Sequence, residues 1–257
     1  MSLGRRVVTV PLREEDDYRL DPERLERTLI ASGAKALILC NPHNPTGRVA
    51  TREELTAIAD VVERHHVVVI ADEIHQDIVR TGVRHVPWLS LDHAATERSV
   101  GLSAATKTFN IAGLKAAHVE AGSTRVAQML GEVDAHFRSS PTSLGLLAAA
   151  VAWEQGGEWL ESTLDRIQDN LETAAEALVR TGRMRTSVPA GTYLLWVQVL
   201  GLGAESAAAW ARRAGVVVSA GETFDLQGRS DWMRVNVATE PEVLAEMLDR
   251  LVGMGVS

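Results

Sequence analysis

Short apolar runs alternate with amphipathic stretches in the first half of the chain. Residues 34–40 and 67–71 are mostly apolar runs of strand length, and the second is rich in β-branched side chains, so both predict buried strands. Between them, residues 51–54 read Thr-Arg-Glu-Glu, a capping-box sequence that predicts a helix ending near His65. Residues 98–103 predict a weaker third strand. Strands that alternate with a helix in this way are typical of parallel α/β units.

The second half of the chain has a different pattern. Residues 123–182 predict helical structure, and one apolar stripe continues to Thr181-Gly182, where glycine can take the left-handed conformation that ends helices. We therefore predict an α/β protein with a large domain over residues 1–160, built on a parallel-rich sheet, and a small C-terminal α+β domain over residues 161–257. Within the small domain the pattern predicts strands at 192–199, 216–219 and 232–237 and helices at 204–214 and 240–252.

The composition excludes several classes of protein. With 46% hydrophobic and 23% charged residues, the 257-residue chain can bury a substantial core. A formal net charge of -8, without a Lys/Arg-rich run, argues against a nucleic-acid partner. No apolar stretch is long enough to span a membrane. The single cysteine, Cys40, lies in an apolar run and is interpreted as a buried small side chain; with no disulfide partner in the chain, a cytoplasmic protein is expected.

Unusual polar residues follow each of the three predicted strands. In parallel sheets, ligands bind beyond the carboxyl ends of the strands. Each of these residues alone has an ordinary explanation as a turn former, a cap or a solvated side chain. An anion, an amide and an amine at one sheet edge are together what a pyridine aldehyde cofactor needs, for its ring nitrogen, its phenolic oxygen and its aldehyde. The three segments are Asn41-Pro42-His43-Asn44-Pro45-Thr46-Gly47, Asp72-Glu73-Ile74-His75 and Ser103-Ala104-Ala105-Thr106-Lys107.

With two further blocks, these segments make the sequence resemble the fold-type I enzymes that depend on pyridoxal 5'-phosphate (PLP), in the class I and II aminotransferase family. The resemblance implies the PLP-dependent transferase-like fold for the large domain. The forms Asp-Glu-Ile-His and Lys-Thr-Phe-Asn-Ile-Ala-Gly-Leu are most similar to the cystathionine β-lyase-like branch, the carbon-sulfur lyases. Five blocks occur in the family's order: residues 41–47, 71–75, 107–114, 190–196 and 233–236.

The resemblance implies a role for each of five residues. Lys107 matches the lysine that carries PLP as a Schiff base and then moves the α-proton of the substrate. Asp72 matches the carboxylate that keeps the pyridine nitrogen protonated, and Asn44 matches the amide that binds the phenolic oxygen. Arg234 matches the arginine that binds the substrate's α-carboxylate. His75 occupies the position where many relatives have a tyrosine. It either donates to the phenolic oxygen or supports Asp72 without touching the cofactor itself.

The phosphate pocket departs from the family's pattern. The family usually has a serine three residues before the lysine, and here that residue is Ala104. Eight residues after the lysine, aminotransferases often have an arginine, whereas this chain has a lysine, which is a point charge and not a fork. Tyr193 and Trp196 are interpreted as core residues. The phosphate contacts are therefore expected from Ser103, Thr106 and Lys115, and no metal ligands are expected.

The resemblance implies an amino-acid substrate and a homodimer. The reaction it favours is β-elimination from an L-cysteine-type thioether, which gives thiol, pyruvate and ammonia. Two alternatives stay open: an aminotransferase that uses the same residues, and a non-catalytic regulatory module with the same fold. Full-length family members have a sizeable portion before the equivalent of Val7, including a phosphate loop and an aromatic residue that stacks on the pyridine ring. We therefore expect the chain as given to bind PLP weakly.

Overall fold

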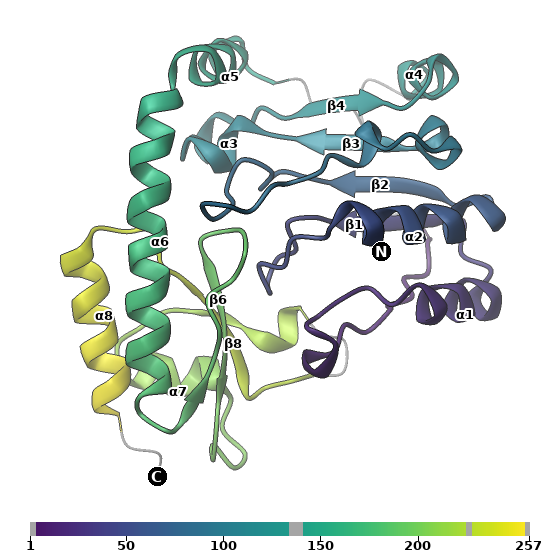
Figure 1. Cartoon of the computed structure of the whole chain (residues 1–257). Helices are drawn as coiled ribbons and strands as arrows, with labels where there is room; N and C mark the ends of the chain where they lie inside the picture. The colour runs from purple at the N-terminus through teal and green to yellow at the C-terminus, as the bar shows by residue number, and fades with distance from the viewer. Residues whose placement is uncertain (1–3, 134–140, 225–227, 255–257) are drawn as a thin grey trace. The chain divides into compact units, whose positions relative to one another are not determined.

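The computed structural model describes residues 4–133, 141–224 and 228–254 (Figure 1). The chain divides into two compact units. The first contains residues up to Pro42, then 48–79 and 83–160, and the second contains residues from Glu161 onward together with the short segments 43–47 and 80–82. The second unit therefore includes two pieces of chain that the sequence pattern had not separated from the large domain.

The first unit contains a four-stranded sheet in the order β1 (Ala36–Cys40), β2 (Val68–Asp72), β3 (Val100–Ser103) and β4 (His118–Ala121) (Figure 1). The first three strands are parallel and β4 pairs antiparallel with β3. The predicted parallel-rich α/β architecture is therefore confirmed, while β4 is an element that the sequence analysis missed.

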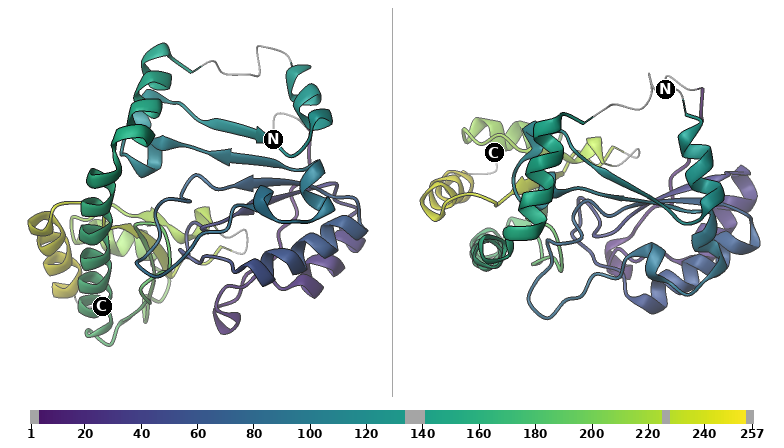
Figure 2. Two further views of the ribbon diagram at one scale, coloured as in Figure 1. Left: turned by 45° about the horizontal axis from the view of Figure 1, so that its top comes forward. Right: turned by 90° about the horizontal axis from the view of Figure 1, so that it is seen from above.

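Helices α1 (Pro22–Ser32) and α2 (Arg52–Arg64) lie next to each other on one side of this sheet (Figure 2). The predicted capping box of α2 is present: Thr51 Oγ1 accepts from the Glu54 amide, and the Glu54 carboxylate accepts from the Thr51 amide at 3.0 Å. One apolar cluster joins Leu25 of α1, Val62 of α2 and Val69 of β2.

The prediction that β1 and β2 are buried strands is correct for one face only. Leu39 and Val69 are buried, whereas Ile38 is 72% exposed and Val68 is exposed as well. The reason is that α1 and α2 cover one face of the sheet, and in the described part of the chain the alternate side chains of β1 have no comparable cover.

The predicted helical stretch consists of three helices: α4 (Thr124–Gly131), α5 (Ser143–Gln155) and α6 (Gly157–Val179). Residues 134–140 lie outside the described residues. The break between α5 and α6 is at Gly156, where a Cβ would come within 2.5 Å of the Phe109 ring. The predicted left-handed glycine after the long helix is confirmed, since Gly182 has φ 68° and its amide donates to Val179 O.

The second unit contains an antiparallel sheet in the order β5, β6, β8, β7, together with two helices besides most of α6. One face of β6 and β8 is buried: Leu195 and Met233 share an apolar cluster with Leu171 of α6 and Leu248 of the last helix. The predicted strand at 216–219 is wrong over most of its length, because only its last residue is in a strand. The bounds are β5 (Met184–Arg185), β6 (Leu194–Val199), α7 (Ala207–Arg213), β7 (Ser219–Ala220), β8 (Trp232–Asn236) and α8 (Pro241–Gly253).

Short helical turns complete the two units. Four residues form α3 (Ala105–Thr108), directly after β3. The 3-10 helices are η1 (Glu14–Asp16), η2 (Trp88–Ser90), η3 (Ala94–Arg98), η4 (Ala112–Leu114) and η5 (Gly221–Thr223). Among the described residues, no helix has the length and apolar character needed to cross a membrane.

Candidate functional site

The carboxyl ends of β2 and β3 bring two of the predicted residues to one sheet edge. Asp72 is the last residue of β2 and is in register with Leu102 of β3, whose last residue is Ser103. Lys107 follows four residues later in α3. The structure therefore places Asp72, Ser103 and the helix that carries Lys107 at the same edge of the first unit, as the strand-end pattern predicts.

The two side chains proposed for chemistry are half-buried and have few protein partners. The Asp72 carboxylate accepts one long hydrogen bond, from the Ile74 amide at 3.4 Å. The Lys107 amine forms no hydrogen bond or ion pair with any residue that the structure describes. A carboxylate and an amine that are partly shielded from water and not paired within the protein remain available to bind a ligand.

The other predicted residues of the first unit differ in burial. His75 is buried, in the turn after β2. Ser103 and Thr106 are half-buried, and Ser103 pairs across strands with His118 of β4. Lys115 is exposed and has φ 51° at the end of η4. The structure brings Ser103 and Thr106 next to Lys107 along the chain, and among the described residues the Lys115 amine has no hydrogen bond or ion pair.

A further residue, Asp77, was missed by the sequence analysis. Thr108 Oγ1 donates to Asp77 Oδ2 at 2.8 Å, and the Trp153 indole N–H points at the same oxygen at 3.5 Å. Because Thr108 directly follows Lys107, this carboxylate anchors α3 to the turn that follows β2. An Asp five residues after Asp72 and a Thr directly after Lys107 were the only signals in the sequence.

In the second unit, Arg234 and Asn44 are in direct contact. Arg234 lies in β8, and its Nη1 donates to Asn44 Oδ1 at 2.8 Å. Its Nη2 donates to Ser219 Oγ at 3.0 Å, and its guanidinium carbon lies 4.7 Å from the centre of the Phe224 ring. Ser219 and Trp196 are the cross-strand neighbours of Arg234 on its two sides. The arginine is therefore held in one orientation by hydrogen bonds and a cation–π contact.

Burial shifts the pKa of two groups in this cluster. Burial lowers the pKa of Arg234 from its ordinary value, and the Tyr193 phenol partly opposes that shift. Burial raises the pKa of Tyr193, which the positive charge of Arg234 partly offsets. Because an arginine starts from a very high pKa, Arg234 stays charged and can bind a carboxylate.

The hydrogen bond to Arg234 also fixes the orientation of the Asn44 amide. Its oxygen accepts from the guanidinium, so its Nδ2 donors point elsewhere and are available to an acceptor oxygen. The loop that carries Asn44 is held at Gly47, which has φ 67° and whose carbonyl accepts from the Gly191 amide at 2.7 Å. A Cβ at position 47 would lie 2.3 Å from Cβ of Pro189, so only glycine allows this approach.

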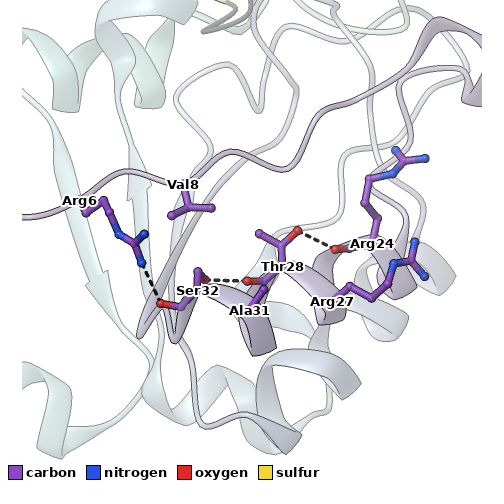
Figure 3. Close-up of a pocket in the computed structure, with 7 residues that line it drawn as sticks. All are labelled: Arg6, Val8, Arg24, Arg27, Thr28, Ala31 and Ser32. Carbon is purple, nitrogen blue, oxygen red and sulfur yellow. Dashed lines mark hydrogen bonds between the residues drawn. The ribbon is translucent and has the colours of Figure 1, made fainter.

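An open hollow of about 400 Å³ lies on α1 and not at the strand ends (Figure 3). Arg24 binds Asp16 and Pro11 O, and Arg6 binds Ser32 O, so two of its guanidinium groups already have partners within the protein. None of the candidate site residues lines it. The lining residues are Arg6, Val8, Arg24, Arg27, Thr28, Ala31 and Ser32.

Comparison with known proteins identifies the family. The sequence model of the family described as "Aminotransferase class I and II" matches residues 2–251. The chain belongs to this family. The predicted family membership is thereby confirmed, with a strand-end arrangement in the first unit that agrees with it.

Relatives in the same family carry lyase and aminotransferase names. The chain is 31% identical to "Cystathionine beta-lyase PatB" of Bacillus subtilis, over 96% of this chain and 65% of that protein. Its fold matches the crystal structure of cystalysin from Treponema denticola, which contains PLP, with a TM-score of 0.85 and 28% identity over 92% of this chain and 61% of that one. The PLP-bound C-S lyase from Staphylococcus hominis gives a TM-score of 0.85 at 28% identity, over 96% of this chain and 65% of that one. The chain thus spans about two thirds of the length of the curated relatives it matches.

Proposed function

We propose that this chain is part of a PLP-dependent carbon-sulfur β-lyase that cleaves an L-cysteine-type thioether to thiol, pyruvate and ammonia. The observation that carries the proposal is the placement of the Asp72 carboxylate and the helix that carries Lys107 at one edge of a parallel sheet, with no strong protein partner described for either side chain. The names of the relatives support the lyase activity.

The residues present fit PLP. Asp72 offers an anion for the ring nitrogen, Lys107 an amine for the aldehyde, and Asn44 an amide donor for the phenolic oxygen. His75, Ser103, Thr106 and Lys115 are proposed as further cofactor contacts. Bound PLP would supply the electron sink for negative charge at the substrate's α-carbon.

The chain's own residues would perform three tasks around that cofactor. Asp72 would keep a proton on the pyridine nitrogen, since a nearby carboxylate stabilises the charged ring. Lys107 Nζ accepts the proton that leaves the α-carbon. Arg234, held by Ser219 and Phe224, binds the α-carboxylate and so orients the substrate.

An aminotransferase is the second candidate, because the same groups begin both reactions and the chain is 26% identical to "Aspartate aminotransferase" of Bacillus subtilis over 96% of its length. The two reactions differ in what they consume. A lyase releases pyruvate from L-cystathionine without a second substrate, whereas an aminotransferase requires a keto acid.

We also propose that the chain divides into a cofactor-binding domain over residues 1–160 and a small domain over residues 161–257. The whole protein is proposed to be a homodimer.

The chain allows a clean test of the covalent attachment because it has only three lysines: Lys35, Lys107 and Lys115. The protein is saturated with PLP, reduced with borohydride, digested and mapped by mass. We expect the adduct on the Lys107 peptide, with Lys35 and Lys115 unmodified. An adduct confined to Lys35 or Lys115 contradicts the cofactor assignment. Pyruvate release from L-cystathionine, with and without added keto acid, then separates the lyase from the aminotransferase.

A further inference from the structure

Three buried polar side chains meet behind the strand ends of the first unit. Asn41 follows β1 and is 3% exposed, Glu73 follows β2 and is 6% exposed, and the His85 side chain, from the loop before η2, is 6% exposed. His85 Nε2 lies 3.3 Å from Glu73 Oε1, and His85 Nδ1 lies 3.4 Å from Asn41 Nδ2. We refer to these three residues as the buried relay.

Backbone amides fix the orientation of both ends of the relay. The Ala50 amide donates to Asn41 Oδ1 at 2.9 Å, so the Nδ2 of Asn41 is the group that faces His85. The Trp88 amide donates to Glu73 Oε1 at 2.7 Å. Because an amide Nδ2 can only donate, His85 Nδ1 is the acceptor in the contact with Asn41. The His85 ring therefore lies between the Asn41 amide, with which it shares a hydrogen bond, and the Glu73 carboxylate, which its Nε2 approaches at 3.3 Å.

The relay residues Asn41 and Glu73 lie next to the segments that carry candidate site residues. The Asn41 amide donates to Asp72 O at 3.0 Å, and Glu73 directly follows Asp72. The Asn41–Ala50 hydrogen bond closes the loop in which Asn44 lies. The chain leaves the first unit after Pro42, directly after Asn41, and it returns to that unit at residue 83, two residues before His85.

A gain in stability does not explain why these three polar side chains are buried. A buried carboxylate and imidazole must give up hydration, and an apolar trio of similar volume would often be as stable. What the polar trio adds is direction, since each hydrogen bond fixes an angle that an apolar contact leaves open.

We propose that Asn41, His85 and Glu73 are positioning residues. They couple the start of the Asn44 loop to the end of β2, and this coupling fixes the positions of Asp72 and of that loop for cofactor binding. The proposal rests on the proposed function for its ligand, PLP. None of the three residues needs to touch the cofactor in order to act in this way.

The coupling can be measured without any cofactor, by hydrogen exchange of single amides. In His85→Phe, the Trp88 amide still has Glu73 as an acceptor and the Ala50 amide still has Asn41, but the bridge between them is gone. We expect exchange at the Ala50 amide to rise by about tenfold or more, because a broken buried hydrogen bond weakens local closure by that order. Glu73→Gln, which keeps an acceptor for Trp88 and is milder for folding, is expected to raise Ala50 exchange as well, although Glu73 does not contact Ala50.

The cofactor arm of the experiment uses borohydride trapping on the full chain. The PLP concentration that traps half of Lys107 is expected to rise by about tenfold in His85→Phe, while urea unfolding remains a single transition. The control is His65→Phe, which removes a half-buried histidine that contacts Glu26 at 2.9 Å in the same unit, and it is expected to leave both readouts within about twofold.

Two results overturn the proposal. Unchanged Ala50 exchange in both His85→Phe and Glu73→Gln shows that the three residues do not act as one unit. Faster Ala50 exchange together with an unchanged trapping concentration shows that the relay is structural only. If the wild-type chain traps no PLP on Lys107 at any concentration, the proposed function fails instead, and Ala50 exchange alone decides the coupling.

Discussion

The two units differ in how firmly the protein holds their candidate functional side chains. In the second unit the Arg234 guanidinium is held in one orientation by Asn44, Ser219 and the Phe224 ring. In the first unit Lys107 has no partner among the described residues, and Asp72 has a single contact at 3.4 Å. A group that only recognises a ligand benefits from being fixed in advance, whereas a group that must form and break bonds has to remain able to exchange partners.

Local structure explains the difference. Arg234 is in the middle of an antiparallel sheet, so a neighbour on each side is guaranteed by the strand register. Lys107 is in a four-residue helix after a strand, and only the adjacent Thr108 is tied down, through Asp77. The lysine is therefore well placed at its backbone and unconstrained at its amine.

The largest effect is expected from Lys107→Met. It should abolish borohydride-trapped PLP completely, because the only half-buried lysine amine at the strand ends is lost. The free energy of unfolding should change by less than about 0.5 kcal/mol, since the amine has no described partner to lose. Urea titration and peptide mapping measure both. Lys115→Met is the matched control and should keep trapping; a large loss of stability in Lys107→Met would mean that the comparison between the units is wrong.

Arg234→Leu should show the reverse behaviour. It leaves Asn44 Oδ1 and Ser219 Oγ without their donor, so the free energy of unfolding should fall by roughly 1.5 to 3 kcal/mol, while PLP is still trapped on Lys107. Arg212→Leu, at an exposed position of α7, serves as the control and should be nearly neutral. Equal stability of the two variants in urea would show that Arg234 is not held as described.

A smaller loss is expected from Ser219→Ala. It removes one hydrogen bond at 3.0 Å from a half-buried guanidinium, at a cost of about 1 kcal/mol. Asn44 and Phe224 still orient the arginine, so the loss should be less than that of Arg234→Leu. Ser230→Ala, at an exposed position in the same unit, should not change the urea midpoint. A Ser219→Ala loss as large as that of Arg234→Leu would mean that the serine, and not the arginine, organises the cluster.

The smallest effect concerns Tyr193. Burial raises the pKa of its phenol above the unfolded value near 10, with Arg234 opposing the shift. A raised folded pKa gives stability that is fully present below the unfolded pKa and is lost as the pH rises through the folded pKa. Tyr193→Phe should therefore flatten the alkaline part of the stability profile. Phenolate absorbance in wild type and Tyr193→Phe isolates this group, because the chain has only two tyrosines, and ionisation of Tyr193 at the ordinary pH would contradict the expectation.

Elements with a strong apolar or capping signal were predictable from the sequence. β2, the Thr51 capping box and Gly182 are present as expected, because each depends on neighbouring residues. β4 was missed because most of its side chains are exposed, so it has no buried face to leave a pattern. The exposure of Ile38 was also not predictable, since it depends on which face the helices cover and not on the strand itself.

The candidate site was predictable only where it follows strand ends. Asp72 and Lys107 belong to this class, and sheet register brings them to one edge. The contact between Asn44 and Arg234 joins residues 190 positions apart, and His85 joins Glu73 and Asn41 from a loop with no periodic pattern. Contacts of this kind depend on how the loops close, which no local preference encodes.

Gly47 has a consequence for how the sequence can vary. Alanine adds a single methyl group, the smallest change a side chain can make, and at position 47 that carbon would meet Pro189 at 2.3 Å and the Gly191 carbonyl at 2.5 Å. At Gly33, which also has a positive φ, nothing lies within 4 Å, so a residue tolerant of that conformation, such as asparagine, is acceptable there. In a library randomised at both positions and sorted for folded protein, position 33 should tolerate several residue types and position 47 only glycine.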